Sequence, residues 1–279
     1  LKLDGLPGAL LAIDDFRVGL KPRPHNSHKG SYGSLAVIGG AAGMSGAALL
    51  ASRAGLQLGA GRVFVGLLQT LAVDPMQPEL MLRSPENALA QATAAVLGPG
   101  LGTSDAALEI LRRVASANFP LLLDADALNL LAVHPVLAAQ VARREATTVI
   151  TPHPAEAARL LATSTEAVQA DRVTAALELA QRFKAHVALK GCGTVIAHPD
   201  GRWRINTRGN PGLASGGSGD VLAGFIASLI AQGADVFEAS CAAVHIFGLT
   251  GEMLFRQKGY SYSATDLALA IPLVLKKFQ

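Results

Sequence analysis

The chain has 279 residues, of which 50% are apolar and 16% are charged, with 29 glycines and 2 cysteines. A chain of this length and composition can bury a large core without a disulfide or metal, and it is not intrinsically disordered. The net charge of +3 includes no run of Lys or Arg, so no nucleic-acid partner is expected. Cys192 and Cys241 match no metal-ligand spacing, which indicates reduced cysteines in a cytoplasmic protein.

No charged residue occurs between Gly30 and Ser52, a segment long enough to be mistaken for a membrane helix. Gly39 and Gly40 would interrupt such a helix near its middle, so we predict a strand, a turn and a helix there. The amino terminus lacks the basic, apolar and small-residue order of a signal peptide. We therefore expect no membrane partner.

Short apolar runs that end in glycine or in a polar turn alternate with longer helical patterns over most of the chain. The predicted strands are 34–38, 62–67, 94–97, 120–123 and 148–150. Helices are predicted at about 45–58, 105–116 and 165–184. This alternation is typical of a buried parallel sheet.

The pattern changes after the last of these helices, where three short strands are predicted at 186–189, 194–197 and 203–205. An Asp-Gly turn at Asp200 and Gly201 predicts a hairpin between the last two. A glycine-rich loop at 209–219 and three helices complete the chain. We predict one α/β domain over residues 1–279. It has three layers, with helices flanking a mostly parallel sheet that has an antiparallel edge.

In an open parallel sheet, ligands bind beyond the carboxyl ends of the strands. Several unusual residues fall at those ends: the glycines of 98–102, Asp124, Asp126, His153, Glu156, Lys190 and the loop 216–220. We therefore expect a ligand site along this edge of the sheet.

The loop at 210–220, Asn-Pro-Gly-Leu-Ala-Ser-Gly-Gly-Ser-Gly-Asp, leads directly into a predicted helix. Consecutive glycines before a helix let backbone amides converge on an anion, and the helix dipole adds positive charge there. Asp220 faces the same space and is placed to accept the proton of an attacking hydroxyl group. Ser218 or Asp220 would also serve as a simple helix cap, but a cap does not require four glycines between Gly212 and Gly219. The loop therefore predicts a phosphoryl site.

Seven segments, in order along the chain, resemble the NAD(P)H-hydrate dehydratase branch of the ribokinase-like superfamily, the YjeF carboxy-terminal domain. They are Lys-Gly-Ser-Tyr-Gly at 29–33, Val-Ile-Gly-Gly at 37–40 with Gly-Ala-Ala at 46–48, Gly-Pro-Gly-Leu-Gly at 98–102, Leu-Asp-Ala-Asp-Ala-Leu-Asn at 123–129, Thr-Pro-His-Pro-Ala-Glu at 151–156, Leu-Lys-Gly at 189–191 with Thr194, and the loop 210–220. Each segment alone is weak evidence for the resemblance, whereas seven segments in order with compatible spacing are specific to this family. Ser218 stands where the family usually has Thr, a change that keeps the hydroxyl group.

The resemblance implies a ribokinase-like fold and a repair reaction. In that reaction the S form of NADH hydrate or NADPH hydrate returns to NADH or NADPH. ADP or ATP, with Mg²⁺ as cofactor, phosphorylates the 6-hydroxyl group, and phosphate then leaves by elimination. ADP is expected because the bacterial members use it. The further expected partners are an NAD(P)H-hydrate epimerase, fused or separate, and other copies of the chain in a homo-oligomer (a tetramer).

By position, the resemblance makes Asp220 the catalytic base. It assigns nucleotide binding to Lys190, Gly191, Cys192, Gly193, Thr194 and Gly219, and hydrate binding to Ala47, Gly102, His153 and Asp220. Small residues at Ala47 and Gly102 suit a ligand that lies against the backbone. Lys190 would neutralise phosphate charge, or would be an exposed lysine at a strand end.

His153 favours this branch over the related vitamin kinases, which carry Asn-x-x-Glu at this place with a Glu that helps to organise magnesium and water. Here the spacing to Glu156 is kept and His replaces Asn. No direct metal ligand is assigned, and Glu156 would act on Mg²⁺ through water. Taken alone, His153 would be a local cap or surface residue and Glu156 a structural residue at a helix start. Asp124 and Asp126 would assist metal or hydroxyl binding, although Asp126 also fits a helix cap and a structural role is favoured.

Other functions stay open from the residues alone. A small-molecule kinase of the same superfamily, acting on a vitamin-precursor alcohol, would share the fold, the glycine loop and Asp220. A nucleotide-binding regulatory module without turnover would have to explain an intact Asp220. A Rossmann dehydrogenase is disfavoured, because 98–102 is Gly-x-Gly-x-Gly and lacks the required third-glycine spacing.

Overall fold

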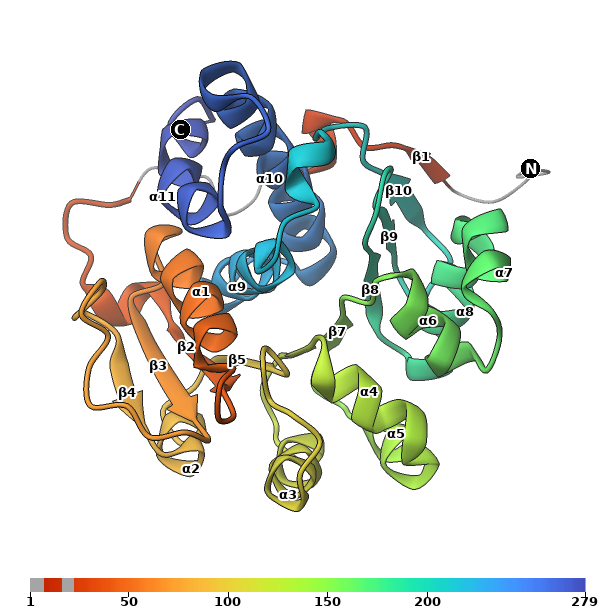
Figure 1. Cartoon of the computed structure of the whole chain (residues 1–279), viewed down its shortest axis with the longest axis horizontal. Helices are drawn as coiled ribbons and strands as arrows, with labels where there is room; N and C mark the ends of the chain where they lie inside the picture. The colour runs from red at the N-terminus through yellow and green to blue at the C-terminus, as the bar shows by residue number, and fades with distance from the viewer. Residues whose placement is uncertain (1–7, 17–22, 279) are drawn as a thin grey trace.

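The computed structural model describes residues 8–16 and 23–278; residues 1–7, 17–22 and 279 of the predicted domain lie outside this description. Within the described residues, ten strands form one sheet in the order β1-β10-β9-β8-β7-β6-β5-β2-β3-β4 (Figure 1). All neighbouring strands are parallel except that β9 is antiparallel to both β8 and β10. The mostly parallel α/β fold predicted from the sequence is confirmed.

The strands are β1 (Gly8–Leu10), β2 (Ser34–Gly39), β3 (Arg62–Leu67), β4 (Met81–Arg83), β5 (Ala94–Leu97), β6 (Leu121–Leu123), β7 (Thr148–Ile150), β8 (His186–Leu189), β9 (Val195–Ala197) and β10 (Trp203–Ile205). The α-helices are α1 (Ser45–Gln57), α2 (Pro85–Leu89), α3 (Asp105–Ala115), α4 (Asp126–Val133), α5 (Pro135–Val141), α6 (Pro154–Leu161), α7 (Thr165–Ala170), α8 (Arg172–Phe183), α9 (Ser218–Ala231), α10 (Val236–Lys258) and α11 (Ala264–Leu275). Three short 3₁₀ helices are η1 (Ile13–Asp15), η2 (Lys29–Tyr32) and η3 (Pro211–Leu213).

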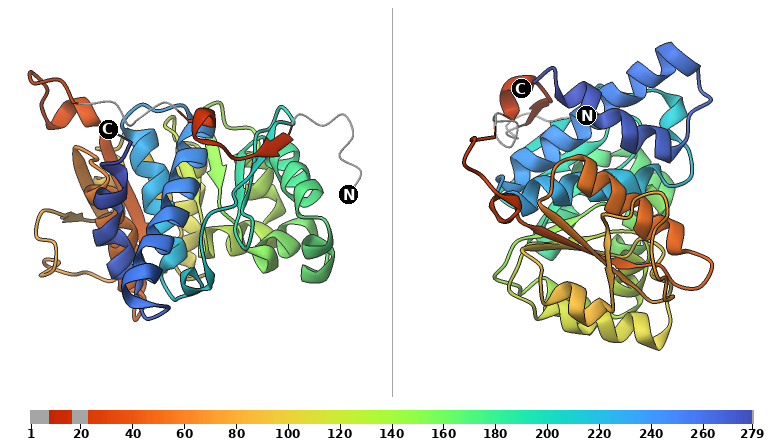
Figure 2. Two further views of the ribbon diagram at one scale, coloured as in Figure 1. Left: turned by 90° about the horizontal axis from the view of Figure 1, so that it is seen from above. Right: turned by 90° about the vertical axis from the view of Figure 1, so that its left-hand side faces the viewer.

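The sheet buries both of its faces. In β2, Leu35 and Val37 belong to the core formed with α1, α9, α10 and α11, whereas Ala36 and Ile38 belong to the core formed with α3, α4, α6 and α8. This alternation follows from the two-residue period of a strand. The right-hand view of Figure 2 shows the blue carboxy-terminal helices on one side of the sheet and the yellow segment around α3 on the other. The three predicted layers are therefore present.

Helices α1 and α9 cross in close backbone contact. A Cβ atom at Gly224 of α9 would lie 1.9 Å from the backbone oxygen of Ala51 in α1. The hydroxyl group of Ser228 donates a hydrogen bond to the Gly55 carbonyl oxygen at 2.8 Å. Small residues at the crossing allow this approach, and α9 is buried from Val221 onward.

The uncharged segment forms η2, β2 and the first part of α1, which confirms the predicted strand, turn and helix. In the part of the chain that the structure describes, no helix has the length and apolar character needed to cross a membrane. The three predicted carboxy-terminal helices are also confirmed as α9, α10 and α11.

The helical stretch predicted at 165–184 is confirmed, but it is divided into two helices, because Asp171 ends α7 and caps α8 by accepting a hydrogen bond from the Thr174 amide at 3.1 Å. One prediction about the sheet is wrong. The antiparallel strand does not lie at the edge, because β10 follows it in the sheet and β1 pairs in parallel outside β10. The short edge strands β1 and β4 were not predicted.

Candidate functional site

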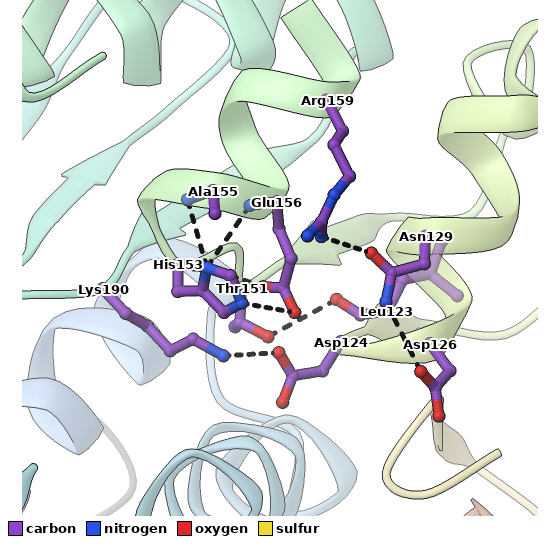
Figure 3. Close-up of polar contacts among 10 residues, drawn as sticks. All are labelled: Leu123, Asp124, Asp126, Asn129, Thr151, His153, Ala155, Glu156, Arg159 and Lys190. Carbon is purple, nitrogen blue, oxygen red and sulfur yellow. Dashed lines mark hydrogen bonds and ion pairs between the residues drawn. The ribbon is translucent and has the colours of Figure 1, made fainter. Parts of the chain in front are cut away.

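The carboxyl ends of β6, β7 and β8 lie side by side in the sheet. They lead directly into Asp124, the segment before His153, and Lys190. The Lys190 amide donates a hydrogen bond to the Pro152 carbonyl oxygen at 2.8 Å, which continues the contact beyond the strands. Three neighbouring parallel strands therefore bring titratable side chains to one place (Figure 3).

The ammonium group of Lys190 forms an ion pair with Asp124, with 2.7 Å between Nζ and Oδ1. The Lys190 side chain is 18% exposed and that of Asp124 is 2% exposed. Burial alone would lower the pKa of Lys190, but the carboxylates of Asp124 and Glu156 raise it above its usual value. Lys190 is thus a fixed, charged group, and its interpretation as an exposed lysine at a strand end is wrong.

Lys190 lies against the amino terminus of α9, where the glycine loop ends. A Cβ atom at Gly219 would lie 3.4 Å from Lys190 Nζ. Gly217, the residue before the helix, has a φ of 87°, which glycine adopts without strain. The first turn of α9 and the ammonium group are therefore neighbours, and both attract anions.

Asp220 lies in the first turn of α9, and its pKa is raised to about 6. Burial is the largest cause and the negative charge of Asp124 adds to it, whereas Lys190 acts in the opposite direction. A carboxylate with a pKa near neutrality can accept a proton effectively at physiological pH. The residue predicted as the base therefore has a proton affinity suited to that role.

His153 and Glu156 form a capping box at the start of α6 (Figure 3). His153 Nδ1 accepts hydrogen bonds from the amides of Ala155 and Glu156 at 3.1 and 3.3 Å, and Glu156 Oε2 accepts one from the His153 amide at 2.8 Å. Burial and the charges of Lys190 and Arg159 lower the pKa of His153, which keeps Nδ1 free to accept. Burial raises the pKa of Glu156. Both residues thus have the structural role considered above, and the His153 side chain is still 47% exposed.

Asp126 is not the cap of α4, so the helix cap considered from the sequence is wrong. The N-cap is Ala125, which makes no side-chain capping bond. The Asp126 carboxylate instead reaches the loop after β5, where its Oδ2 accepts a hydrogen bond from the Gly102 amide at 2.8 Å.

Ala47 and Gly102, the two small residues expected beside the hydrate, lie on neighbouring segments. A Cβ atom at Gly100 would lie 3.2 Å from that of Ala47, and one at Gly102 would lie 3.5 Å from that of Ala41. The loop 98–102 therefore packs against the start of α1 and the turn before it. Contact of Ala47 and Gly102 with a hydrate stays a prediction.

Arg172, the first residue of α8, holds the segment predicted to bind the nucleotide, and it was missed from the sequence. Its guanidinium group donates hydrogen bonds to the carbonyl oxygens of Leu189, Lys190 and Cys192 at 2.8–3.0 Å. The signal that could have located it is Asp171, whose capping role places Arg172 at the start of a helix.

The rest of the predicted nucleotide segment is the turn between β8 and β9. Gly191 and Gly193 have φ angles of 139° and 68°, which few other residues adopt. The hydroxyl group of Thr194 donates to the Gly191 carbonyl oxygen at 3.1 Å, and the free thiol of Cys192 is exposed. The turn is thus fixed from within by Thr194 and from outside by Arg172.

A family model described as NAD(P)H-hydrate dehydratase matches residues 35–273 of the chain. The chain belongs to this family. The matched range includes every residue predicted for the site, from Ala47 to Asp220. The family assignment made from the seven sequence segments is confirmed.

Two relatives within the NAD(P)H-hydrate dehydratase family differ in length. The ADP-dependent (S)-NAD(P)H-hydrate dehydratase of Neisseria meningitidis is 44% identical over 246 residues, which cover 86% of this chain and 83% of that protein. The bifunctional NAD(P)H-hydrate repair enzyme of Escherichia coli is 42% identical over 258 residues, which cover 89% of this chain and 48% of that protein. The chain therefore spans about half the length of this bifunctional relative.

A solved structure supports the same assignment. The ADP/ATP-dependent NAD(P)H-hydrate dehydratase from Bacillus subtilis, co-crystallised with ATP and Mg²⁺, matches with a TM-score of 0.84 and 29% identity. The match covers 99% of this chain and 100% of that chain. The predicted ribokinase-like fold is confirmed. The roles of individual residues toward nucleotide and hydrate stay predictions.

Proposed function

We propose that this chain dehydrates the S form of NADH hydrate and NADPH hydrate to NADH and NADPH, with ADP or ATP as the phosphoryl donor. The observation that carries this proposal is the grouping of Asp220, Lys190 and Asp124 at the start of α9. It provides a base and a positive anion site together. Membership of the family and the names of the relatives support the substrates.

The nucleotide phosphates would bind where Gly219 and Lys190 adjoin, because the helix amides and the ammonium group both attract negative charge there. The rest of the nucleotide would lie against the turn 190–194, which Arg172 fixes. The hydrate would approach from the side of Ala47, Gly102 and His153. In this arrangement the 6-hydroxyl group and the phosphoryl donor meet at Asp220.

The first chemical step is phosphoryl transfer. Asp220 takes the proton of the 6-hydroxyl group as the hydroxyl oxygen attacks the terminal phosphoryl group of the nucleotide. The leaving group is ADP when ATP is the donor and AMP when ADP is the donor. Lys190, held by Asp124, stabilises negative charge on the phosphoryl oxygens. The base then holds the proton until the product is released.

The second step separates a dehydratase from a kinase. The lone pair of the ring nitrogen forms a double bond to C6 as the C6–O bond breaks and phosphate leaves. Transfer of the C5 proton to the departing phosphate or to water then restores the 5,6 double bond of NADH or NADPH. A kinase would stop at the phosphorylated alcohol, so the identity of the product distinguishes the two functions.

The oxygen donors near Lys190 fit a Mg²⁺ ion that binds together with the nucleotide. The negative charge of Asp124 raises the pKa of both Glu156 and Asp220, so the three carboxyl groups lie near one another. Mg²⁺ is typically held by one or two carboxylates plus phosphates. Among residues 8–16 and 23–278, no three His, Cys, Asp or Glu side chains form a metal site by themselves. Glu156 would act through water, and the bound ion would neutralise charge on the transferred phosphoryl group.

We further propose that the chain forms one domain over residues 1–279 and acts in the cytoplasm as a homo-oligomer, a tetramer. Leu269 and Leu273, which are 57% and 60% exposed on α11, support an interface between copies. Light scattering tests the oligomer, and a monomer mass at micromolar concentration would contradict it.

An epimerase, fused or separate, would supply the S form, and the double length of the bifunctional relative supports a fused arrangement.

The decisive experiment mixes the protein with NADH hydrate, Mg²⁺ and either ADP or ATP, and follows the recovery of NADH absorbance. Recovery with one nucleotide supports the proposal, and no recovery with either contradicts it. A stable phosphorylated product would identify a kinase instead. The Asp220→Asn variant should bind nucleotide without turnover, which separates an enzyme from a regulatory module.

A further inference from the structure

The Asp126 carboxylate joins two segments on the proposed hydrate side of the site. Its Oδ2 accepts a hydrogen bond from the Gly102 amide at 2.8 Å, and its Oδ1 accepts one from Asn129 Nδ2 at 3.4 Å. Gly102 ends the loop 98–102, which contains neither helix nor strand. The first turn of α4 therefore holds a loop that has no regular structure of its own.

Asn129 contacts the second oxygen of Asp126, and Arg159 in turn contacts Asn129 (Figure 3). Arg159 Nη1 donates a hydrogen bond to Asn129 Oδ1 at 2.8 Å. This bond occupies the amide oxygen of Asn129 and leaves its Nδ2 facing Asp126. Rotation of the Asn129 amide would break both bonds, so the carboxylate has a fixed partner on each oxygen.

The backbone before Asp126 is held in a conformation that non-glycine residues rarely adopt. Ala125 has a φ of 49° and a ψ of −118°. Such conformations cost free energy and concentrate at functional sites. This corner directs two carboxylates, one residue apart, to different partners: Asp124 to Lys190 and Asp126 to Gly102.

Fixing Gly102 also fixes the loop against the start of α1. The Ala41 amide donates a hydrogen bond to the Gly100 carbonyl oxygen at 2.6 Å, which ties the middle of the loop to the turn before α1. The bond to Asp126 holds the end of the same loop. The position of the loop 98–102 relative to Ala47 therefore depends on both contacts.

We propose that Asp126 is a positioning residue that sets the affinity of the site for the hydrate by holding the Gly102 amide, with Asn129 and Arg159 holding Asp126 in turn. Asp124, its neighbour beyond the strained corner, serves the nucleotide side through Lys190. This division between the two substrates rests on the proposed function.

The test compares Asp126→Ala with the wild type in steady-state kinetics. Loss of a charge-assisted hydrogen bond should raise the KM for NADH hydrate by about tenfold to a hundredfold. The KM for ADP and, at about pH 8, kcat should stay within about threefold. Lys190 keeps its partner, and loss of the Asp126 charge only lowers the pKa of Asp220, which is already ionised at that pH. Asn129→Ala should shift the same KM by less. Glu109→Gln, on the exposed surface of α3, is the control and should change none of these values.

Two measurements without turnover separate this proposal from the proposed function. Hydrogen exchange at the Gly102 amide should be faster in Asp126→Ala, and calorimetry should show weaker hydrate binding with unchanged ADP binding. Unchanged exchange, or equal loss of both affinities, would overturn the proposal. If the wild type binds hydrate but regenerates no NADH, the reaction is wrong while the binding data still test Asp126. If Asp126→Ala does not fold, Asp126→Asn is measured and should shift hydrate affinity in the same direction.

Discussion

The ammonium group of Lys190 lies 2.7 Å from the Asp124 carboxylate and 3.4 Å from the position that a Cβ atom would take at Gly219. One lysine therefore links the ends of β8 and β6 to the start of α9. The same pair has opposite effects on Asp220, whose pKa is raised by Asp124 and lowered by Lys190. The proton affinity of the proposed base thus depends on both members of the pair.

Removing Lys190 alone should destabilise the fold. We expect Lys190→Met to lower the free energy of unfolding by about 3 kcal/mol, because the buried Asp124 charge loses its partner. The double variant Lys190→Met/Asp124→Leu should recover most of that loss without recovering activity, since apolar replacement of a whole buried pair is often neutral. Urea unfolding measures both variants. Equal stability of the single and double variants would contradict the expectation.

The pH dependence of the reaction should report Asp220. Only the ionised carboxylate accepts a proton, and its pKa is raised to about 6. We therefore expect kcat/KM to be constant at about pH 7–8.5 and to fall about tenfold per pH unit below 6. NADH recovery at low hydrate concentration gives the profile. A kcat/KM that does not change between about pH 5 and 7 would exclude Asp220 as the base.

The same pKa shift predicts a gain in stability for Asp220→Asn. The folded-state pKa lies above the usual value of 3.8, so the folded protein binds this proton more tightly. The charged group therefore disfavours folding above about pH 6 and has no such cost below about pH 4. The free energy of unfolding of Asp220→Asn should exceed that of the wild type by about 2 kcal/mol at pH 7.5 and should differ little from it at pH 4. Denaturant unfolding at the two pH values checks this, and a loss at pH 7.5 would refute it.

Arg172→Lys should weaken nucleotide binding selectively. A lysine cannot reproduce the planar fork that contacts three carbonyl oxygens, so the turn 190–194 would lose its outer support. We expect the KM for ADP to rise about tenfold and the KM for NADH hydrate to stay unchanged. Arg182→Lys, an exposed basic position on the same helix, is the matched control. Parallel increases in both KM values would show a general structural effect instead.

The central strands could be predicted from the sequence because both of their faces are buried, which produces continuous apolar runs. The bounds of β3, β5 and β7 agree with the predictions to the residue. The edge strands β1 and β4 could not be predicted from the sequence, because each has only three residues and none of these residues is buried.

The site shows a similar division. Asp220 and Lys190 could be predicted, because their chemistry stands out beside a glycine loop and a strand end. The contacts of Asp126 and Arg172 could not, because their partners are backbone groups far away along the chain. The local sequence pattern is typical of a helix cap at Asp126. The amide that Asp126 binds is found only from the position of the loop 98–102 in the structure.

The crossing of α1 and α9 limits how the two substrates can meet. α1 begins on the proposed hydrate side and α9 on the phosphate side, and at Gly224 no space separates them for even a methyl group. Neither helix can slide along the other without breaking this contact. The distance between the proposed acceptor and donor groups is therefore set by the interior of the protein. We therefore expect entry and release of the two substrates to depend on the surrounding loops and not on movement of α1 against α9.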